Sequence, residues 1–177
     1  MKYLKKLSII ILLTVLSISV NAQEHFKFLG ISISGTFTDI KPKLESAGFE
    51  FVGKEQGYDM YSFIGSFIGK VTKISVSLTP ISKQVMSISC SFKGHSTLEE
   101  ASLEYIDIVK SLNAKYGASV RSKDLANDIV SQSAWNIETA YITAIIYGER
   151  KCTLLYMDRI NGILFNKEME TINQSQL

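Results

Sequence analysis

Two histidines, His25 and His95, offer the first test for catalysis, since imidazole is the side chain best suited to proton transfer near neutral pH. His25 lies near the predicted start of the mature chain. His95 lies in a Gly-His-Ser turn ahead of a predicted helix. Histidines in such turns and near termini are typically solvated, without a nucleophile held beside them. We therefore predict no histidine-based mechanism.

The common motifs that carry chemistry are also missing from the sequence. A nucleophile elbow needs glycine two residues before and two residues after its serine, and the residues around Ser66 depart from this pattern at both positions. There is no Walker loop, C-x-x-C, H-E-x-x-H or EF-hand loop. The four Cys and His residues are scattered along the chain, whereas zinc wants three or four converging ligands. The sequence predicts no metal and no cofactor.

Carboxylates leave one enzymatic alternative open. Paired acids can perform hydrolysis when they converge in a pocket. Asp59, Asp128 and Asp158 are the candidates, and a small secreted hydrolase is the function that their convergence would support. Most acidic residues fall in polar loops or on a solvated helix face, which favours a non-catalytic interpretation.

Residues 1–22 have the three parts of a cleavable export signal. Lys2, Lys5 and Lys6 form a positive start, residues 7–20 form an apolar run, and Val20-Asn21-Ala22 supplies small residues at the expected cleavage point. We predict a mature product that begins at Gln23 and is periplasmic or secreted. No later segment approaches the length of a membrane span, so we expect no stable span after cleavage.

Removal of this leader changes the charge of the chain. Three of the 19 Lys and Arg lie in residues 1–22, together with none of the 17 Asp and Glu, so the mature chain has a net charge of −1. Nucleic-acid binding usually needs a basic stripe, and none is present. We therefore exclude nucleic acid as a partner and expect a protein, a peptide or a glycan.

Residues 23–177 are predicted to form a single α+β domain, since this length suffices for one hydrophobic core. A helix is expected from Thr38, as N-cap, to Gly48, and a longer one follows a Ser96-Thr97-Leu98-Glu99 capping box and ends at Gly117. Gly65 suggests a bulge or a bend in its strand, and one turn of helix is expected over residues 165–172. The expected strands cover residues 26–33, 49–54, 58–68, 71–78, 84–92, 118–121, 129–137, 139–147 and 150–158.

Two similar halves, about residues 30–94 and 95–160, each contain a helix followed by strands. Residues 71–78 and 84–92 alternate between apolar and polar side chains, which indicates an antiparallel sheet with one dry and one wet face. We predict an antiparallel sheet with two helices on one face. Ancient duplication and two ordinary α/β units in sequence both explain the pattern.

Cys90 and Cys152 lie in two predicted strands. An exported protein folds in an oxidising compartment, so the sequence leaves a single disulfide open beside the alternative of two buried free thiols.

An aromatic patch is the one functional hint in the sequence. Tyr141, Thr143 and Tyr147 alternate with small aliphatic residues that suit packing against a helix, which favours the aromatic side as the open face of the sheet. Packing of the aromatic side chains against one another is the alternative. The residues expected to join this patch are Trp135, Tyr61, Phe63 and Phe67.

Short segments near the start of the chain resemble a group of small exported bacterial proteins of uncharacterised function, and this resemblance implies export. The doubled plan of helix and sheet is also similar to the β-lactamase inhibitor protein fold and to BamE-type outer-membrane assembly lipoproteins. Unlike the latter, this chain has no cysteine near its cleavage point. The segments concerned are Asn21-Ala22-Gln23, Phe28-Leu29-Gly30-Ile31, Gly35-Thr36-Phe37, Lys43-Leu44, Gly48-Phe49 and Lys115-Tyr116-Gly117.

Taken together, these features predict an exported, non-enzymatic binding or envelope-associated module that uses the open face of its sheet. The alternatives are the small secreted hydrolase and an inhibitor of a secreted enzyme.

Overall fold

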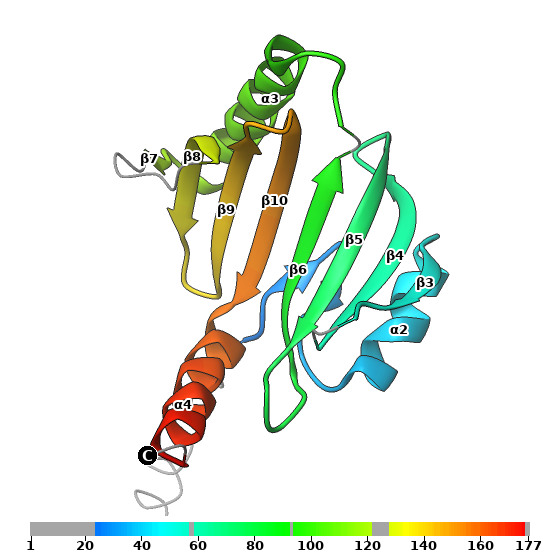
Figure 1. Ribbon diagram of the computed structural model, residues 1–177, viewed down its shortest axis with the longest axis vertical. Coiled ribbons are helices and arrows are strands. Elements are labelled where there is room, and N and C mark those ends of the chain that lie inside the picture. Colours follow the sequence, from blue (N-terminus) through cyan, green and yellow to red (C-terminus); the bar gives the residue numbers. More distant parts are fainter. Residues whose placement is uncertain (1–23, 57–58, 93, 122–127, 176–177) are drawn as a thin grey trace, which may run out of the picture.

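The computed structural model describes residues 24–56, 59–92, 94–121 and 128–175, so the predicted leader lies outside the described residues. The fold is α+β, as the sequence predicts (Figure 1). An eight-stranded antiparallel sheet is accompanied by a small hairpin of β1 (Lys27–Phe28) and β2 (Ile31–Ser32). Among the described residues, no helix is long and apolar enough to cross a membrane.

The two halves repeat one order of elements, a helix followed by four strands. The sheet order is β3-β4-β5-β6-β10-β9-β8-β7, so each half forms a meander and the halves join through the central β6–β10 pair. The first half comprises α2 (Phe37–Ser46), β3 (Glu50–Lys54), β4 (Met60–Phe67), β5 (Lys70–Leu78) and β6 (Val85–Phe92). The second comprises α3 (Leu98–Tyr116), β7 (Val120–Arg121), β8 (Ile129–Asn136), β9 (Ala140–Tyr147) and β10 (Lys151–Asp158).

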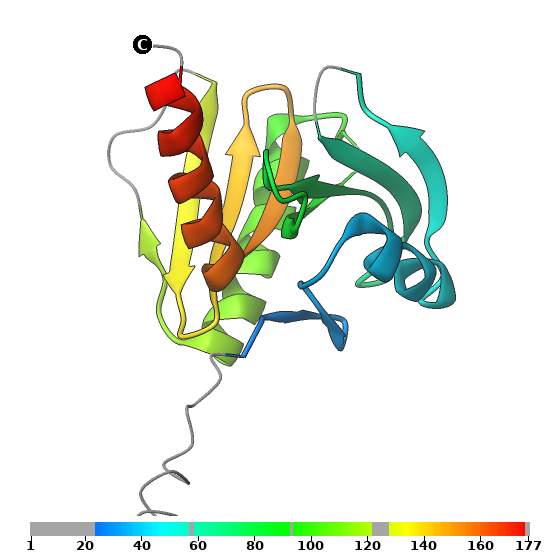
Figure 2. The ribbon, with the colours of Figure 1, turned by 90° about the horizontal axis from the view of Figure 1, so that it is seen from below.

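The strand register divides the sheet into two faces. Ile88 of β6 is paired with Tyr156 of β10, which is paired with Ile142 of β9, so these three side chains share one face. We call this the helix face, because α2 and α3 both pack on it, as predicted (Figure 2). The opposite side of the sheet, which Figure 1 views, is called the open face.

Alternation in β5 and β6 is confirmed. Ile74, Val76 and Ile88 have no exposed surface on the helix face, whereas Lys73 and the intervening serines point to the open face. Burial of each large aliphatic side chain contributes about 2 kcal/mol, so the packed helix face is the main source of the stability of the fold.

The helix starts differ slightly from the prediction. The N-cap of α2 is Thr36 rather than Thr38, and its backbone N–H donates to Asp39 Oδ2 at 2.7 Å. The N-cap of α3 is Thr97, whose hydroxyl accepts from Glu100 N at 3.1 Å, one residue later than the predicted box. At α3 the shift follows from the Thr97 hydroxyl reaching a free N–H of the first turn, and at α2 it follows from the Asp39 carboxylate reaching back to the Thr36 N–H.

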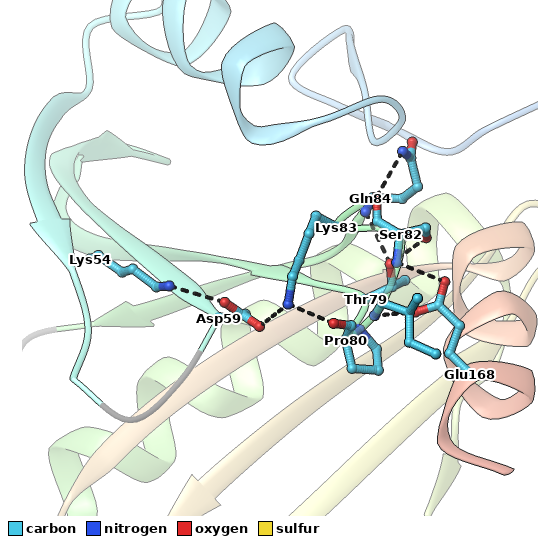
Figure 3. A network of polar contacts seen from close by, with 9 residues as sticks. Lys54, Asp59, Thr79, Pro80, Ser82, Lys83, Gln84 and Glu168 are labelled. Carbon is cyan, nitrogen blue, oxygen red and sulfur yellow. Dashed lines mark hydrogen bonds and ion pairs between the residues drawn. The ribbon is translucent and has the colours of Figure 1, made fainter. Parts of the chain in front are cut away.

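The C-terminal helix is longer than predicted. Instead of one turn, α4 (Arg159–Ser175) begins directly after β10 and lies on the open-face side of the sheet, opposite to α3 (Figure 2). Asp158 starts it, because its Oδ1 accepts from Asn161 N at 2.9 Å. Glu168 holds the third turn, where its carboxylate accepts from the backbone N–H groups of Ile81 and Ser82 at 2.7 and 3.2 Å (Figure 3).

Of the two alternatives predicted at Gly65, the bulge is wrong, because the register shift lies in β3, between Phe51 and Gly53. The need for glycine at residue 65 is steric. A Cβ there would lie 2.3 Å from Cδ1 of Phe49 and 3.0 Å from the backbone oxygen of Gly48. The strand therefore carries glycine because the buried Phe49 ring packs directly on its backbone.

We expect Gly65→Ala to lower the free energy of unfolding by about 2 kcal/mol, the usual effect of overpacking. In a Phe49→Ala background, the same change should cost about half as much, because the clashing ring is gone and only the Gly48 oxygen stays close. Urea unfolding of the four proteins measures this coupling. Gly94→Ala is the control, because no atom lies within 4 Å of its added Cβ. Additive effects of the two changes would contradict the steric explanation.

Candidate binding surface

The open face carries the three β9 residues that the sequence proposed for binding. Tyr141, Thr143 and Tyr147 alternate with the buried residues of β9 and lie on this face. Tyr141 is 40% exposed, while the other two are half-buried between neighbouring strands.

The other four proposed residues lie on the helix face, which corrects the prediction for Trp135, Tyr61, Phe63 and Phe67. The reason is register. Trp135 is paired with Ile142, which belongs to the helix face, and β4 places its three aromatic side chains on that same face.

Each of these aromatic side chains has a structural partner beneath the helices. Trp135 Nε1 donates to Asn113 Oδ1 at 3.1 Å and to the Gly117 carbonyl oxygen at 3.0 Å, so it anchors the end of α3. The Tyr61 ring stacks on Phe37 of α2 with centroids 3.6 Å apart. Phe63 is fully buried, and Phe67 is buried against other core rings.

A cation lies beside each of the two β9 tyrosines. The Arg159 guanidinium lies 4.6 Å from the centre of the Tyr141 ring, and its Nη2 donates to the carbonyl oxygen of Ile137 at 2.6 Å. At the other end of β9, Lys151 Nζ lies 6.0 Å from the centre of the Tyr147 ring. Burial raises the pKa of Tyr147, with a further contribution from the nearby Asp128 carboxylate, so this phenol stays neutral at physiological pH.

Hydroxyl groups, together with the apolar side chains of Ile145, Leu155 and Met157, form the floor between these two ends. Ser91 of β6 and Thr153 of β10 are paired across the centre of the sheet, with their oxygens 3.4 Å apart. Ser62, Ser75, Ser87 and Thr153 are buried, so the hydroxyls that this floor offers to a ligand are those of half-buried residues such as Ser89 and Ser91. The remaining hydroxyl side chains on this floor are Ser62, Ser75, Ser77, Ser87, Ser89 and Thr143.

A groove of about 560 Å³ lies on the open face, at the end where Lys151 begins β10. Ile64 and Val71 form its apolar side and are 48% and 68% exposed. The remaining residues that line this groove are Lys73, Ser91, Phe92, Gly94, Glu149 and Lys151.

The charges of this groove are not equivalent. Lys73 Nζ lies 2.6 Å from Glu55 Oε1, which also accepts from the Ser62 hydroxyl at 2.5 Å. These hydrogen bonds, first from Lys73 and then from Ser62, hold the pKa of Glu55 below its ordinary value. The Lys73 charge is therefore matched on the protein itself, whereas Lys151 stands beside Tyr147 at the rim.

Comparison with protein-family models, curated proteins and solved structures finds no match to this chain. The function must be argued from the surface itself.

The three carboxylates of the hydrolase alternative do not converge. Asp59 and Asp158 lie at the same end of the sheet, but β5 and β6 separate their strands, and three inter-strand spacings amount to about 14 Å. Asp128 precedes β8 at the opposite end of β9, about 24 Å away along the strand.

Each of these acids already has a local role. Lys83 and Lys54 bind the Asp59 carboxylate at 2.6 and 3.0 Å and hold its pKa below the ordinary value (Figure 3). Asp158 is fully buried and accepts three hydrogen bonds within the fold. Over the described parts of the chain, no group of three or more His, Cys, Asp and Glu is placed to hold a metal ion.

The cysteines are both free and buried, so the disulfide alternative is wrong. Cys90 is paired with Leu154, which places Cys152 two positions further along β10. Such diagonal neighbours lie about 7 Å apart, beyond the reach of a disulfide. Burial raises the pKa of Cys152 to about 12, and the Glu104 carboxylate contributes, so its thiol stays protonated.

Sequence reasoning missed the contribution of Arg159 to this surface. The sequence feature that could have identified Arg159 is its position directly after an apolar strand. A long side chain at such a position can extend over the end of the neighbouring strand. Its partner Tyr141 is distant in sequence, so only the β9–β10 pairing brings the two together.

Proposed function

We propose that this chain is an exported, non-enzymatic binding module whose open face holds a protein ligand. The observation that carries the proposal is the part of the open face that α4 leaves uncovered, where Tyr141 with Arg159 at one end and the groove beside Lys151 at the other flank a floor of mixed hydroxyl and apolar side chains. Export is supported by the charged start, apolar run and small residues within positions 1–22.

A protein ligand is favoured over a glycan by the kinds of residue that stand out from this floor. Tyrosine and arginine dominate the energetics of protein interfaces, and Tyr141 and Arg159 form such a pair. Exposed aliphatic side chains at Ile64 and Val71 suit the apolar centre of a protein interface better than the hydroxyl-rich surface of a sugar.

Site-specific photo-crosslinking tests this proposal in cells that export the protein. A photoreactive residue at position 141 or 147 should give a discrete adduct with one protein, whereas the same residue at the exposed Leu103 of α3 should not. Tyr141→Ala should weaken binding of the captured protein at least tenfold, an effect typical of a hot spot.

Three outcomes would contradict the proposal: equal crosslinking from positions 141 and 103, unchanged affinity in Tyr141→Ala, or adducts that contain only glycan. An adduct with a secreted enzyme that loses activity on binding would support the proposal and identify the chain as an inhibitor.

A further inference from the structure

Two hairpin turns on the helix-face side have a backbone conformation that does not suit their residues. Leu29-Gly30 joins β1 to β2, and Ile68-Gly69 joins β4 to β5. All four residues have positive φ, with Leu29 at 51° and Ile68 at 49°, which is the signature of a type I′ turn. The first position of such a turn favours asparagine, aspartate or glycine, and a β-branched residue there is strained.

The strain presents aliphatic side chains to the surface rather than to the core. Leu29 is 53% exposed and Ile68 is 60% exposed. The other two non-glycine residues with positive φ in the described ranges, Lys83 and Arg150, are polar, as is usual at such positions. Strained residues at the surface point to a function, because neither packing nor turn chemistry accounts for them.

Both turns border one cleft on the helix face. Leu29 and Ile68 line a cavity of about 330 Å³ between the N-terminal hairpin and the end of α3. A second cavity of about 240 Å³ continues along α3, and the two share Phe67, Ile68 and Tyr156. The cleft thus runs along α3 from Glu104 to Tyr116, a helix length of about 18 Å.

The second cavity is suited to an apolar chain. Ile108 and Leu112 of α3 form one wall, Phe67 and Ile68 form the other, and Leu154 lies between them on β10. At its far end, Glu104 binds both Lys70 Nζ and His95 Nε2, the latter at 2.5 Å.

Charge distinguishes the two ends of the cleft. The lining of the first cavity contains Lys27 and Lys115 and no acidic residue. In the second cavity, the Lys70 ammonium is paired with Glu104, and Asp107 adds a negative charge. An anionic group is therefore favoured at the Lys27 and Lys115 end and disfavoured at the other.

We propose that this cleft binds an amphiphile with one acyl chain and an anionic head group. The chain lies along α3 over Phe67 and Leu154, under the lip formed by Leu29 and Ile68, and the head group lies between Lys27 and Lys115. Burial of each methylene of the chain contributes about 0.8 kcal/mol, and the lysines set its direction.

Titration of the purified protein with myristate tests this site, with isothermal calorimetry and displacement of cis-parinaric acid as the two readouts. We expect saturable binding of one molecule. Tetradecanol, which lacks the charge, should bind about tenfold more weakly.

Two variants distinguish an effect on ligand binding from an effect on the stability of the fold. Ile68→Asn places a residue favoured by the turn, so its melting temperature should rise while its affinity for myristate falls about tenfold. Lys115→Gln should weaken myristate binding but leave tetradecanol binding unchanged. The controls are Ile81→Asn, an exposed aliphatic residue in the turn at the far end of β5, and Lys110→Gln on α3; both should bind within about twofold of the original protein.

Several results would overturn the proposal. These are absence of saturable myristate binding, unchanged affinity in both Ile68→Asn and Leu29→Asn, or binding only to anionic phosphatidylglycerol vesicles. Reversible dimerisation that is abolished by Ile68→Asn would assign the cleft to a second copy of the chain instead. None of these results bears on Tyr141, so this proposal can fail without the proposed function failing.

Discussion

Asp158→Ala should lower the free energy of unfolding by about 4 kcal/mol, because a fully buried carboxylate then leaves three partners behind. Asp158 Oδ2 accepts from Phe26 N at 2.8 Å, and Oδ1 accepts from Asn161 N at 2.9 Å and lies 3.0 Å from His25 Nδ1. Urea unfolding measures the loss, and hydrogen exchange at the Phe26 amide should accelerate.

Two further variants separate this role from the general loss of an acid. Asp158→Asn keeps one oxygen for the start of α4, so it should cost about half as much. Asp59→Ala, which removes two exposed ion pairs at the same end of the sheet, should cost less than about 1 kcal/mol. Similar losses for Asp158→Ala and Asp59→Ala would show that the buried network is not what holds the N-terminal segment.

Trp135→Ala should lower the free energy of unfolding by about 4 kcal/mol, whereas Tyr141→Ala should change it by less than about 1 kcal/mol. The two residues were expected on one aromatic face, but Trp135 is 3% exposed under α3 and Tyr141 lies on the open face. Because Trp135 is the only tryptophan, far-ultraviolet circular dichroism rather than fluorescence is the appropriate measurement.

Trp135→Phe refines this comparison. It keeps most of the buried ring but removes the donor to Asn113 and Gly117, so a loss of about 1–2 kcal/mol is expected. An equally small change in the free energy of unfolding for Trp135→Ala and Tyr141→Ala would contradict the placement of Trp135 between β8 and α3.

Local signals were enough for much of the fold. The alternation in β5 and β6 identified both faces, since serines and Lys73 mark the wet side. The capping box at residues 96–99 and Gly117 identified the longest helix to within one residue of its N-cap, and the repeated order of helix and strands agrees with the sheet topology. Each of these features depends on neighbours within one segment.

The wrong predictions concern features that depend on contacts between segments distant in sequence. In β4 and β8 both faces carry apolar side chains, so the placement of Tyr61 and Trp135 depends on strand register, which sequence alternation does not supply. The extent of α4 depends on bonds from Glu168 to the turn after β5. In the candidate site, the two β9 tyrosines could be predicted, but their cations could not.

The central ladder between β6 and β10, which pairs Cys90 with Leu154, has a consequence for how the chain reaches its native state. Before this ladder forms, each meander ends in a long hydrophobic edge with unpaired backbone groups, a template for intermolecular aggregation. Joining segments so distant in sequence carries a loop-closure cost and is expected to be slow. The nascent polypeptide thus needs protection until both meanders have emerged and met.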